Sequence, residues 1–315
     1  MGLKYYTMIA IMVNVKQFSK YVMYAISCAA LLLVSCATTE GGGKNTAAMA
    51  MKLGPGIVNM ALPAVIKSSE RKLKKDTHNQ KLVVDAGSFN IMYANAFIQG
   101  QAKMLPLSKY EKRDKENAKA QKYYARGVEI LNAGLEDKYP GITSADTDVI
   151  TKEYLPKITK EDVPLIYWLT AGTFCAFAND PFDLKYGSKI APLSLLIKKA
   201  YEIDPDYNTS TLDEFFFLYY AALPQDLGGD ITKAPQYYER AVSKTKGLSA
   251  GIYVSWAEVI SIPKQDYKDF IEKINMAMAI DPKKTPDIKL MNVLAHEKAE
   301  HYLKNAGRYF LDTEQ

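Results

Sequence analysis

The chain has 315 residues, of which 48% are hydrophobic and 24% charged, the profile of a globular protein with enough length to bury a sizeable core. The net charge of +5 falls to +2 once residues 1–35, which hold three lysines and no acid, are set aside. A charge so close to neutral gives no electrostatic basis for binding nucleic acid.

The N-terminal residues have the layout of an export signal. Lys16 and Lys20 precede an apolar run of 13 residues from Val22 to Val34. A run of this length suits the core of a signal peptide and is short for a permanent membrane helix, which needs about 20 residues. We therefore predict a signal peptide over residues 1–35. A membrane helix or the signal of a soluble secreted protein is the alternative interpretation.

The apolar run ends in LVSC at positions 33–36, which resembles a bacterial lipobox. Small residues before the cysteine let the backbone enter the signal peptidase, and a lipid is joined to the thiol of Cys36. Acyl chains such as palmitate then hold the mature protein at a membrane, and each buried methylene contributes about 0.8 kcal/mol. Residues 36–54 are mostly small and polar, and we expect them to form a flexible tether.

Helical periodicity dominates residues 55–315, and no convincing alternating run predicts a strand. Four segments place two larger or apolar residues and then a small one at positions i, i+4 and i+7, where the small residue lets a second helix approach closely. The four small residues are Gly127, Ala200, Ala241 and Ala277. Their successive spacings are 73, 41 and 36 residues, and the last two are near the 34-residue period of tetratricopeptide repeats.

We therefore predict an all-α fold of tetratricopeptide-like helix pairs in a compact or closed superhelical bundle. Ala222 is the only small residue at the matching position of a first helix, so we expect an irregular superhelix. Asp204-Pro205 and Asp281-Pro282 predict two helix ends, because proline cannot continue a helix. The predicted helices cover residues 63–75, 82–104, 114–137, 162–178, 190–203, 211–223, 232–245, 252–261, 266–280 and 287–304.

Three features of the connecting segments add detail to this helix prediction. Pro63 suits a first helical turn, and Asp230 is the predicted cap of the helix over 232–245. The segment 138–161 is long for a connector, and we expect it to cover an opening or to meet a partner.

Residues with metal or catalytic chemistry form no convincing constellation. His296 and His301 are five apart, about 140° around a helix, whereas metalloprotease histidines stand at i and i+4. Asp146 and Asp148 lack the glycine and the distal glutamate of a calcium loop. Together with His78 they are predicted to be surface groups. We predict no metal, no cofactor and no enzyme activity.

Two further features have an ordinary interpretation. Cys175 is predicted to be a small buried hydrophobe. The basic stretch over 67–76 is predicted to be a solvated helix face, with contact to anionic lipid headgroups as the alternative.

Aromatic residues gather on two predicted helices. Five of the six residues over 215–220 are aromatic and cannot share one helix face. Either neighbouring helices on both sides bury them, or some line an apolar cavity or a subunit interface. The candidates for that second role are Tyr167, Trp168, Phe174, Phe216, Tyr219, Tyr220 and Trp256.

Eight stretches, taken in order, resemble the T-component lipoproteins of TRAP-type transporters. They read LPAVIKSSERKL (62–73), YANAFIQGQA (93–102), YYARGVEILNAGLEDKYPG (123–141), DVPLIYWLTAGTF (162–174), AYEIDPDY (200–207), FFFLYYAALPQDLGGDITKAPQYYERAV (215–242), YVSWAEVISIPKQDYKDFIEKINMAMAIDP (253–282) and LMNVLAHEKAEHYL (290–303). Each stretch is weak alone, but the ordered set behind a lipobox is fairly specific.

The resemblance implies a non-enzymatic periplasmic lipoprotein that docks the TRAP solute-binding protein. It implies a ring-like homo-oligomer, with a trimer favoured, and a hydrophobic channel through the helical body as the route for an apolar organic acid. The alternative is a general periplasmic scaffold that binds proteins without a ligand of its own. A third hypothesis, a lipoprotein enzyme, would need a positioned catalytic glutamate that the sequence does not single out.

Overall fold

The computed structural model describes residues 54–312, which form helices and loops with no β-strand. The predicted signal peptide over 1–35, the lipidation site Cys36 and all of the predicted tether except Gly54 lie outside the described residues. Among the described helices, none is both long and apolar enough to cross a membrane.

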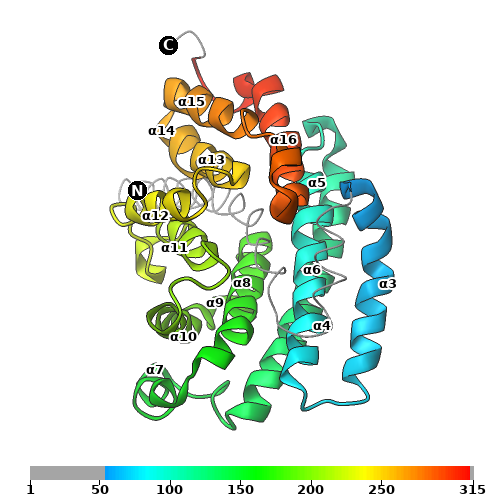
Figure 1. Cartoon of the computed structure of the whole chain (residues 1–315), viewed down its shortest axis with the longest axis vertical. Helices are drawn as coiled ribbons and strands as arrows, with labels where there is room; N and C mark the ends of the chain where they lie inside the picture. Colours follow the sequence, from blue (N-terminus) through cyan, green and yellow to red (C-terminus); the bar gives the residue numbers. More distant parts are fainter. Residues whose placement is uncertain (1–53, 313–315) are drawn as a thin grey trace, which may run out of the picture.

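Long helices that run side by side make up the first half of the body (Figure 1). They are α3 (Pro55–Leu73), α4 (Gln80–Met92), α6 (Tyr110–Lys138) and α8 (Val163–Asn179). A π-helical segment, η3 (Tyr93–Gln99), continues α4 into the short helix α5 (Gly100–Lys103). Helix α6 is central, because it packs against both α4 and α8.

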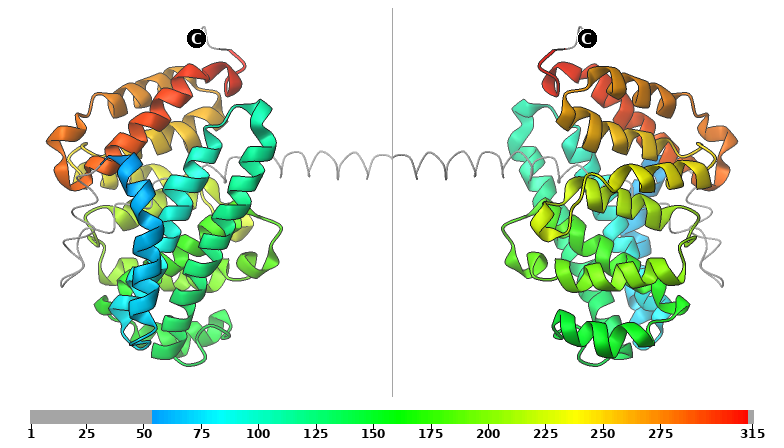
Figure 2. Two further views of the ribbon diagram at one scale, coloured as in Figure 1. Left: turned by 90° about the vertical axis from the view of Figure 1, so that its right-hand side faces the viewer. Right: turned by 90° about the vertical axis from the view of Figure 1, so that its left-hand side faces the viewer.

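The helices of the second half stack crosswise to α6 (Figure 2). They are α9 (Leu184–Gly187), α10 (Ile190–Ile203), α11 (Thr211–Ala222), α12 (Ala234–Lys244), α13 (Ala250–Trp256), α14 (Ile262–Lys264), α15 (Tyr267–Met278) and α16 (Lys289–Lys304). The π-helical segment η9 (Ala257–Ser261) joins α13 to α14. Helix α11 packs on α12, and α13, α15 and α16 pack on one another.

Short helical turns are the remaining helical elements among the described residues. They are η4 (Leu107–Lys109), α7 (Thr147–Val149), η5 (Ile150–Tyr154), η6 (Leu155–Lys157), η7 (Lys160–Asp162), η8 (Gln225–Leu227), η10 (Pro282–Lys284), η11 (Pro286–Ile288) and η12 (Ala306–Arg308). The segment 138–161, predicted as a loop, therefore holds four of these turns, and Asp146 and Thr159 cap two of them, α7 and η7.

The predicted small residues are buried, which confirms their inward positions. Gly127, Ala200, Ala241 and Ala277 all lie inside the protein, although the tetratricopeptide-like arrangement itself stays a prediction. At Gly127 the fit is close, because a Cβ atom there would lie 2.8 Å from the backbone oxygen of Gly87 on α4. Helices α4 and α6 therefore cross with their backbones almost in contact.

The predicted helix end at Asp204-Pro205 is confirmed, and two finer predictions are wrong. Helix α10 ends at Ile203 with Asp204 as its C-terminal cap. Pro63 lies inside α3 instead of its first turn; it is solvent-exposed, so the carbonyl group it leaves without a helical partner can be hydrated. Asp230 does not cap α12, because its carboxylate accepts hydrogen bonds from Thr232 in the preceding turn.

Two hydrophobic cores meet at α11. Phe215, Phe216 and Tyr219 belong to the core formed with α3 to α10, whereas Phe217 and Leu218 belong to the core formed with α12 to α16. Successive residues of a helix point about 100° apart, so an apolar helix between two layers buries side chains in both directions. This arrangement explains why the segment carries more aromatic residues than one face can hold.

Candidate functional site

An apolar pocket opens between α6, α8, α9 and α10, and we call it the α6–α10 pocket. Its volume is about 380 Å³, which falls within the range of small-molecule binding sites. The apolar part of its lining consists mainly of Val128, Ile142, Ile150, Leu169, Leu193 and Leu196. Ile142, Thr143 and Ile150 of the segment 138–161 form one side, so this segment borders an opening, and its predicted role as a cover stays a prediction.

Charged groups stand among the residues that line the α6–α10 pocket. They are Glu129 and Glu136 from α6, Lys185 from α9 and Lys189 from the turn before α10. Both lysines are exposed, and neither forms an ion pair within residues 54–312. The ammonium group of Lys189 donates a hydrogen bond of 2.8 Å to the carbonyl oxygen of Thr143.

Glu136 holds the segment that borders the pocket. Its carboxylate accepts hydrogen bonds from the backbone N–H of Gly141 at 2.6 Å and from the N–H and hydroxyl of Thr143 at 3.2 and 2.6 Å. These hydrogen bonds, led by that from the Thr143 hydroxyl, lower the pKa of Glu136 below its ordinary value. Gly141 has φ of +89°, a left-handed conformation that favours glycine.

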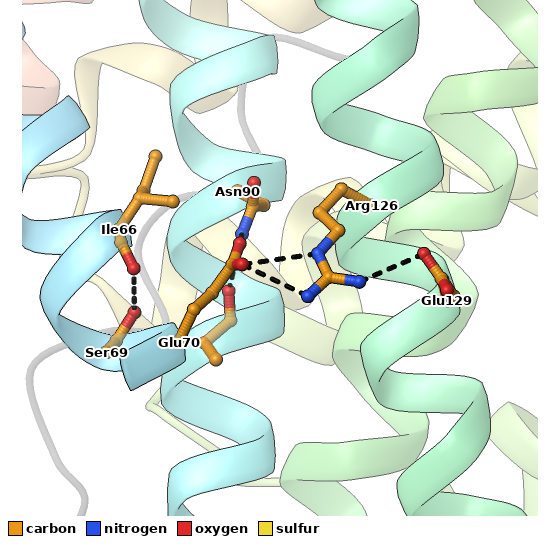
Figure 3. Close-up of polar contacts among 7 residues, drawn as sticks. Ile66, Ser69, Glu70, Asn90, Arg126 and Glu129 are labelled. Carbon is orange, nitrogen blue, oxygen red and sulfur yellow. Dashed lines mark hydrogen bonds and ion pairs between the residues drawn. The ribbon is translucent and has the colours of Figure 1, made fainter. Parts of the chain in front are cut away.

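The carboxylate of Glu129 is engaged in a chain of contacts that joins α3, α4 and α6 (Figure 3). Arg126 donates to Glu129 at 3.1 Å and to Glu70 on α3 at 3.1 and 3.3 Å. Glu70 also accepts from the side-chain amide of Asn90 on α4. Glu70 therefore links the basic stretch 67–76 to α4 and α6.

A second, much smaller cavity lies where the two halves meet. It has a volume of about 40 Å³ and is lined by residues of η3, α5, α13 and α16, including Ala96, Val254 and Lys298. Lys298 forms an ion pair with Glu258, which is buried on the π-helical segment η9. A space of this size suits a few water molecules and not an organic ligand.

The seven predicted aromatic candidates lie in the packed interior or at its edge. Tyr167, Trp168, Phe216 and Tyr219 are buried, and Phe174 and Tyr220 are half-buried against the same core. Trp256 is half-buried against the other core and donates a hydrogen bond of 2.7 Å to Asp269. None of the seven lines either pocket described above.

Most of these aromatic side chains contact one another around α11. The Phe174 ring lies 5.6 Å from that of Phe215 and 5.8 Å from that of Tyr219. The Tyr220 ring stacks on that of Tyr237 at 5.3 Å. These distances are those of favourable aromatic pairs.

Cys175 is buried, as predicted, in a polar network inside the first half. The amide of Asn95 on η3 donates to the Cys175 sulfur at 3.6 Å and to the hydroxyl of Tyr124 at 3.2 Å. Tyr124 in turn donates to Gln99 at 2.9 Å. Burial raises the pKa of the Cys175 thiol to about 12, so the nucleophilic thiolate is suppressed.

Two adjacent buried acids begin α11, and no sequence pattern pointed to them. Asp213 pairs with Lys244 at 2.6 Å and accepts a hydrogen bond of 2.6 Å from Tyr201. Glu214 accepts one from Ser210 at 2.6 Å, while its second oxygen has no hydrogen bond within residues 54–312. Burial raises the pKa of Glu214 to about 8.

The histidines and the loop acids lie apart from one another. His78 contacts Asp137 at 2.8 Å, His296 contacts the carbonyl oxygen of Ala277 at 3.0 Å, and His301 lies beside Asn305. Asp146 caps α7 by accepting from the N–H of Val149, and Asp148 is exposed. Within residues 54–312 no group of three or more metal-ligating side chains comes together.

Sequence reasoning missed the charged residues of the α6–α10 pocket. Lys185 and Lys189 carry no motif, and their place in one lining with residues of α6 depends on how α9 and α10 pack on α8. The available signal was the length of the segment 138–161.

Comparisons with known proteins give one family and one relative. The family model described as TRAP transporter T-component matches residues 54–310. An uncharacterized protein of Treponema pallidum (strain Nichols) is 29% identical over 260 residues, which cover 81% of this chain and 80% of that protein.

Proposed function

The chain belongs to the family of TRAP transporter T-components, and from this premise we propose that it is a lipid-anchored periplasmic accessory subunit that docks the transporter's solute-binding protein. The observation that carries the proposal is the extent of the family match, which covers residues 54–310 and so nearly all of the described body. The family is that of a transport component and not an enzyme family.

The N-terminal sequence supports the proposed location. The signal-like run before LVSC at positions 33–36 would direct the chain out of the cytoplasm, and acylation of Cys36 would fix it to a membrane. The tether after Cys36 would then let the helical body reach a partner near that membrane.

The architecture supports a role in binding. Buried small residues on α10, α12 and α15 fit tetratricopeptide-like pairing, which presents extended surfaces to protein partners. We also propose a ring-like homo-oligomer, with a trimer favoured, in keeping with the family resemblance. Within it an apolar organic acid would be held or passed on through the helical body.

We propose that some of the predicted aromatic candidates line a channel or a subunit interface. The half-buried members, Phe174, Tyr220 and Trp256, can be truncated with less loss of packing than the buried ones. A displacement assay with a hydrophobic probe tests this role. It compares probe binding by the wild type with binding by the Phe174→Ala and Tyr220→Ala variants. Unchanged binding in folded variants would argue against a channel beside α11.

A capture experiment tests the proposed function. The full chain, tagged at its C-terminus, is expressed in its own host and recovered from a detergent extract of the membranes, and captured proteins are identified by mass spectrometry. We expect a TRAP solute-binding protein at near-stoichiometric yield, and none from an unrelated tagged lipoprotein. Recovery of several other envelope proteins without a solute-binding protein would overturn the proposal and favour a general scaffold.

A further inference from the structure

We propose that the α6–α10 pocket binds an organic anion with an apolar body, and that Lys185 and Lys189 hold its carboxylate at the mouth. This inference deepens the ligand-holding part of the proposed function and rests on that part alone. It assigns a location and two anchoring residues, and neither residue lies among the aromatic residues around α11.

The walls of the pocket suit an apolar body. The exposed surface of the lining is mostly apolar, and a cavity of about 380 Å³ accommodates a medium-sized organic molecule. The hydroxyl of Thr173, which also lines the pocket, donates a hydrogen bond of 2.8 Å to the carbonyl oxygen of Leu169. This hydroxyl proton is therefore already used within α8.

Hydrogen-bonding capacity at the mouth favours a ligand that carries acceptors. The carboxylate of Glu129 is paired at 3.1 Å with Arg126, which also pairs with Glu70 (Figure 3). The oxygens of Glu136 already accept three hydrogen bonds from Gly141 and Thr143. The lining therefore holds two lysines and two glutamates, and its engaged carboxylates leave the lysine N–H donors for a carboxylate of the ligand.

The lysines are placed to donate to an incoming carboxylate. An ammonium group has three N–H donors, and Lys189 uses one of them on the carbonyl oxygen of Thr143. This contact holds the side chain beside the opening while two donors stay available. The Lys185 ammonium lies 5.6 Å from the Tyr186 ring centre and forms no ion pair within residues 54–312. Charge-assisted hydrogen bonds from both would fix one end of a ligand.

Asn132 adds a neutral polar group to the same site. It lies on α6, is half-buried in the lining, and makes no side-chain hydrogen bond within the described part of the chain. An amide can donate and accept, so it can contact a carboxylate or a hydroxyl of the ligand. Together with the lysines it supplies the few convergent polar contacts that orient a ligand in an otherwise apolar site.

Other small ligands fit these groups less well. A small inorganic anion would satisfy the lysines but leave the apolar walls facing water. A neutral apolar molecule would cover the walls but give Lys185 and Lys189 no counter-charge. An amphipathic monocarboxylate satisfies both requirements.

Direct binding of radiolabelled decanoate tests the inference. The full chain is reconstituted in lipid nanodiscs, and equilibrium dialysis at pH 7.5 measures bound decanoate after subtraction of empty nanodiscs. We expect one saturable site per chain. The double variant Lys185→Ala/Lys189→Ala should bind at least about tenfold more weakly, because charge-assisted hydrogen bonds are lost. The matched control is Lys198→Ala, which removes an exposed lysine of α10 outside the pocket lining.

Two further measurements separate this site from non-specific uptake. Ala133→Trp places a large ring at an exposed position of the lining and should abolish saturable binding without disturbing the core. Decanol, which lacks the charge, should compete at least about tenfold less well than unlabelled decanoate. Binding that is unchanged in the lysine double variant or in Ala133→Trp, or equal competition by decanol, would overturn the inference.

The capture experiment described above keeps the two proposals distinguishable. A chain that recovers the solute-binding protein but shows no saturable decanoate site would overturn only the pocket assignment. A chain that binds decanoate through the lysines but recovers no solute-binding protein would overturn the docking proposal and leave the pocket assignment standing.

Discussion

Helix α6 in the first half and helix α15 in the second both place a small residue where another helix approaches. In α6 the residue is Gly127, and an added Cβ atom would lie 2.8 Å from the backbone oxygen of Gly87. In α15 it is Ala277, which is fully buried and has room for its methyl group. The same spacing rule thus leads to backbone contact in one half and to ordinary side-chain packing in the other.

The interiors of the two halves hold different polar networks. The first half buries a network of amides and hydroxyls that runs from Asn95 through Tyr124 to Gln99 and on to Asn179. The core of the second half is built around side chains such as Phe270 and Ile274. The second half also buries polar groups, because Glu258 pairs with Lys298 and the side-chain amide of Asn292 donates to Leu248 and Thr285. Both interiors therefore combine apolar packing with buried hydrogen bonds.

The largest expected effect is in the apolar second core. Phe270 is fully buried, and its ring lies 4.9 Å from that of Phe310. Phe270→Ala should lower the free energy of unfolding by about 3–5 kcal/mol, because it removes buried apolar surface and leaves a cavity. Urea denaturation measures the loss. Phe182→Ala, at an exposed position, is the control and should change little.

The second prediction addresses the close crossing of α4 and α6. Gly127→Ala should cost about 1–3 kcal/mol of unfolding free energy, because the new methyl group meets backbone and forces the helices apart. Gly56→Ala in α3 is the control, since a Cβ atom there meets nothing within 4 Å. It should leave stability unchanged or raise it by up to about 1 kcal/mol. Equal effects of the two substitutions would contradict the described crossing.

The third prediction is a pH dependence at α11, which joins the two cores. The pKa of Glu214 is about 8 in the folded chain against an ordinary value of 4.5, and burial is the main cause. Its contribution to stability is therefore full below about pH 4.5 and is lost as the pH rises toward 8. The slope is at most about 1.4 kcal/mol per pH unit.

The Glu214→Gln variant tests this pH dependence directly. Glutamine can still accept the hydrogen bond from Ser210, but it does not ionise. Thermal unfolding from pH 5 to pH 8 should show the wild type losing stability relative to the variant. Parallel pH profiles for the two proteins would show that Glu214 titrates normally in the folded chain.

Most helices could be predicted from the sequence, but less of the candidate site could. Helix α10 over 190–203 begins and ends where periodicity and Asp204-Pro205 place it, because both signals are local. The π-helical segments within the predicted helices 82–104 and 252–261 carry no comparable local signal. Pro63 and Asp230 were misplaced because a proline on a solvent face and a turn carboxylate each have more than one compatible position.

The sequence by itself determined the family, the helical character and the inward position of the small residues, because ordered motifs and periodicity are properties of the local chain. Only the tertiary structure decided that α11 faces two cores and that the α6–α10 pocket exists. The hydrogen-bonding capacity of the pocket depends on contacts such as Lys189 to Thr143, 46 residues apart, and Arg126 to Glu70, 56 residues apart. No local pattern encodes such pairs, because they form only when α3 has packed on α4 and α10 on α8, with α6 between α4 and α8.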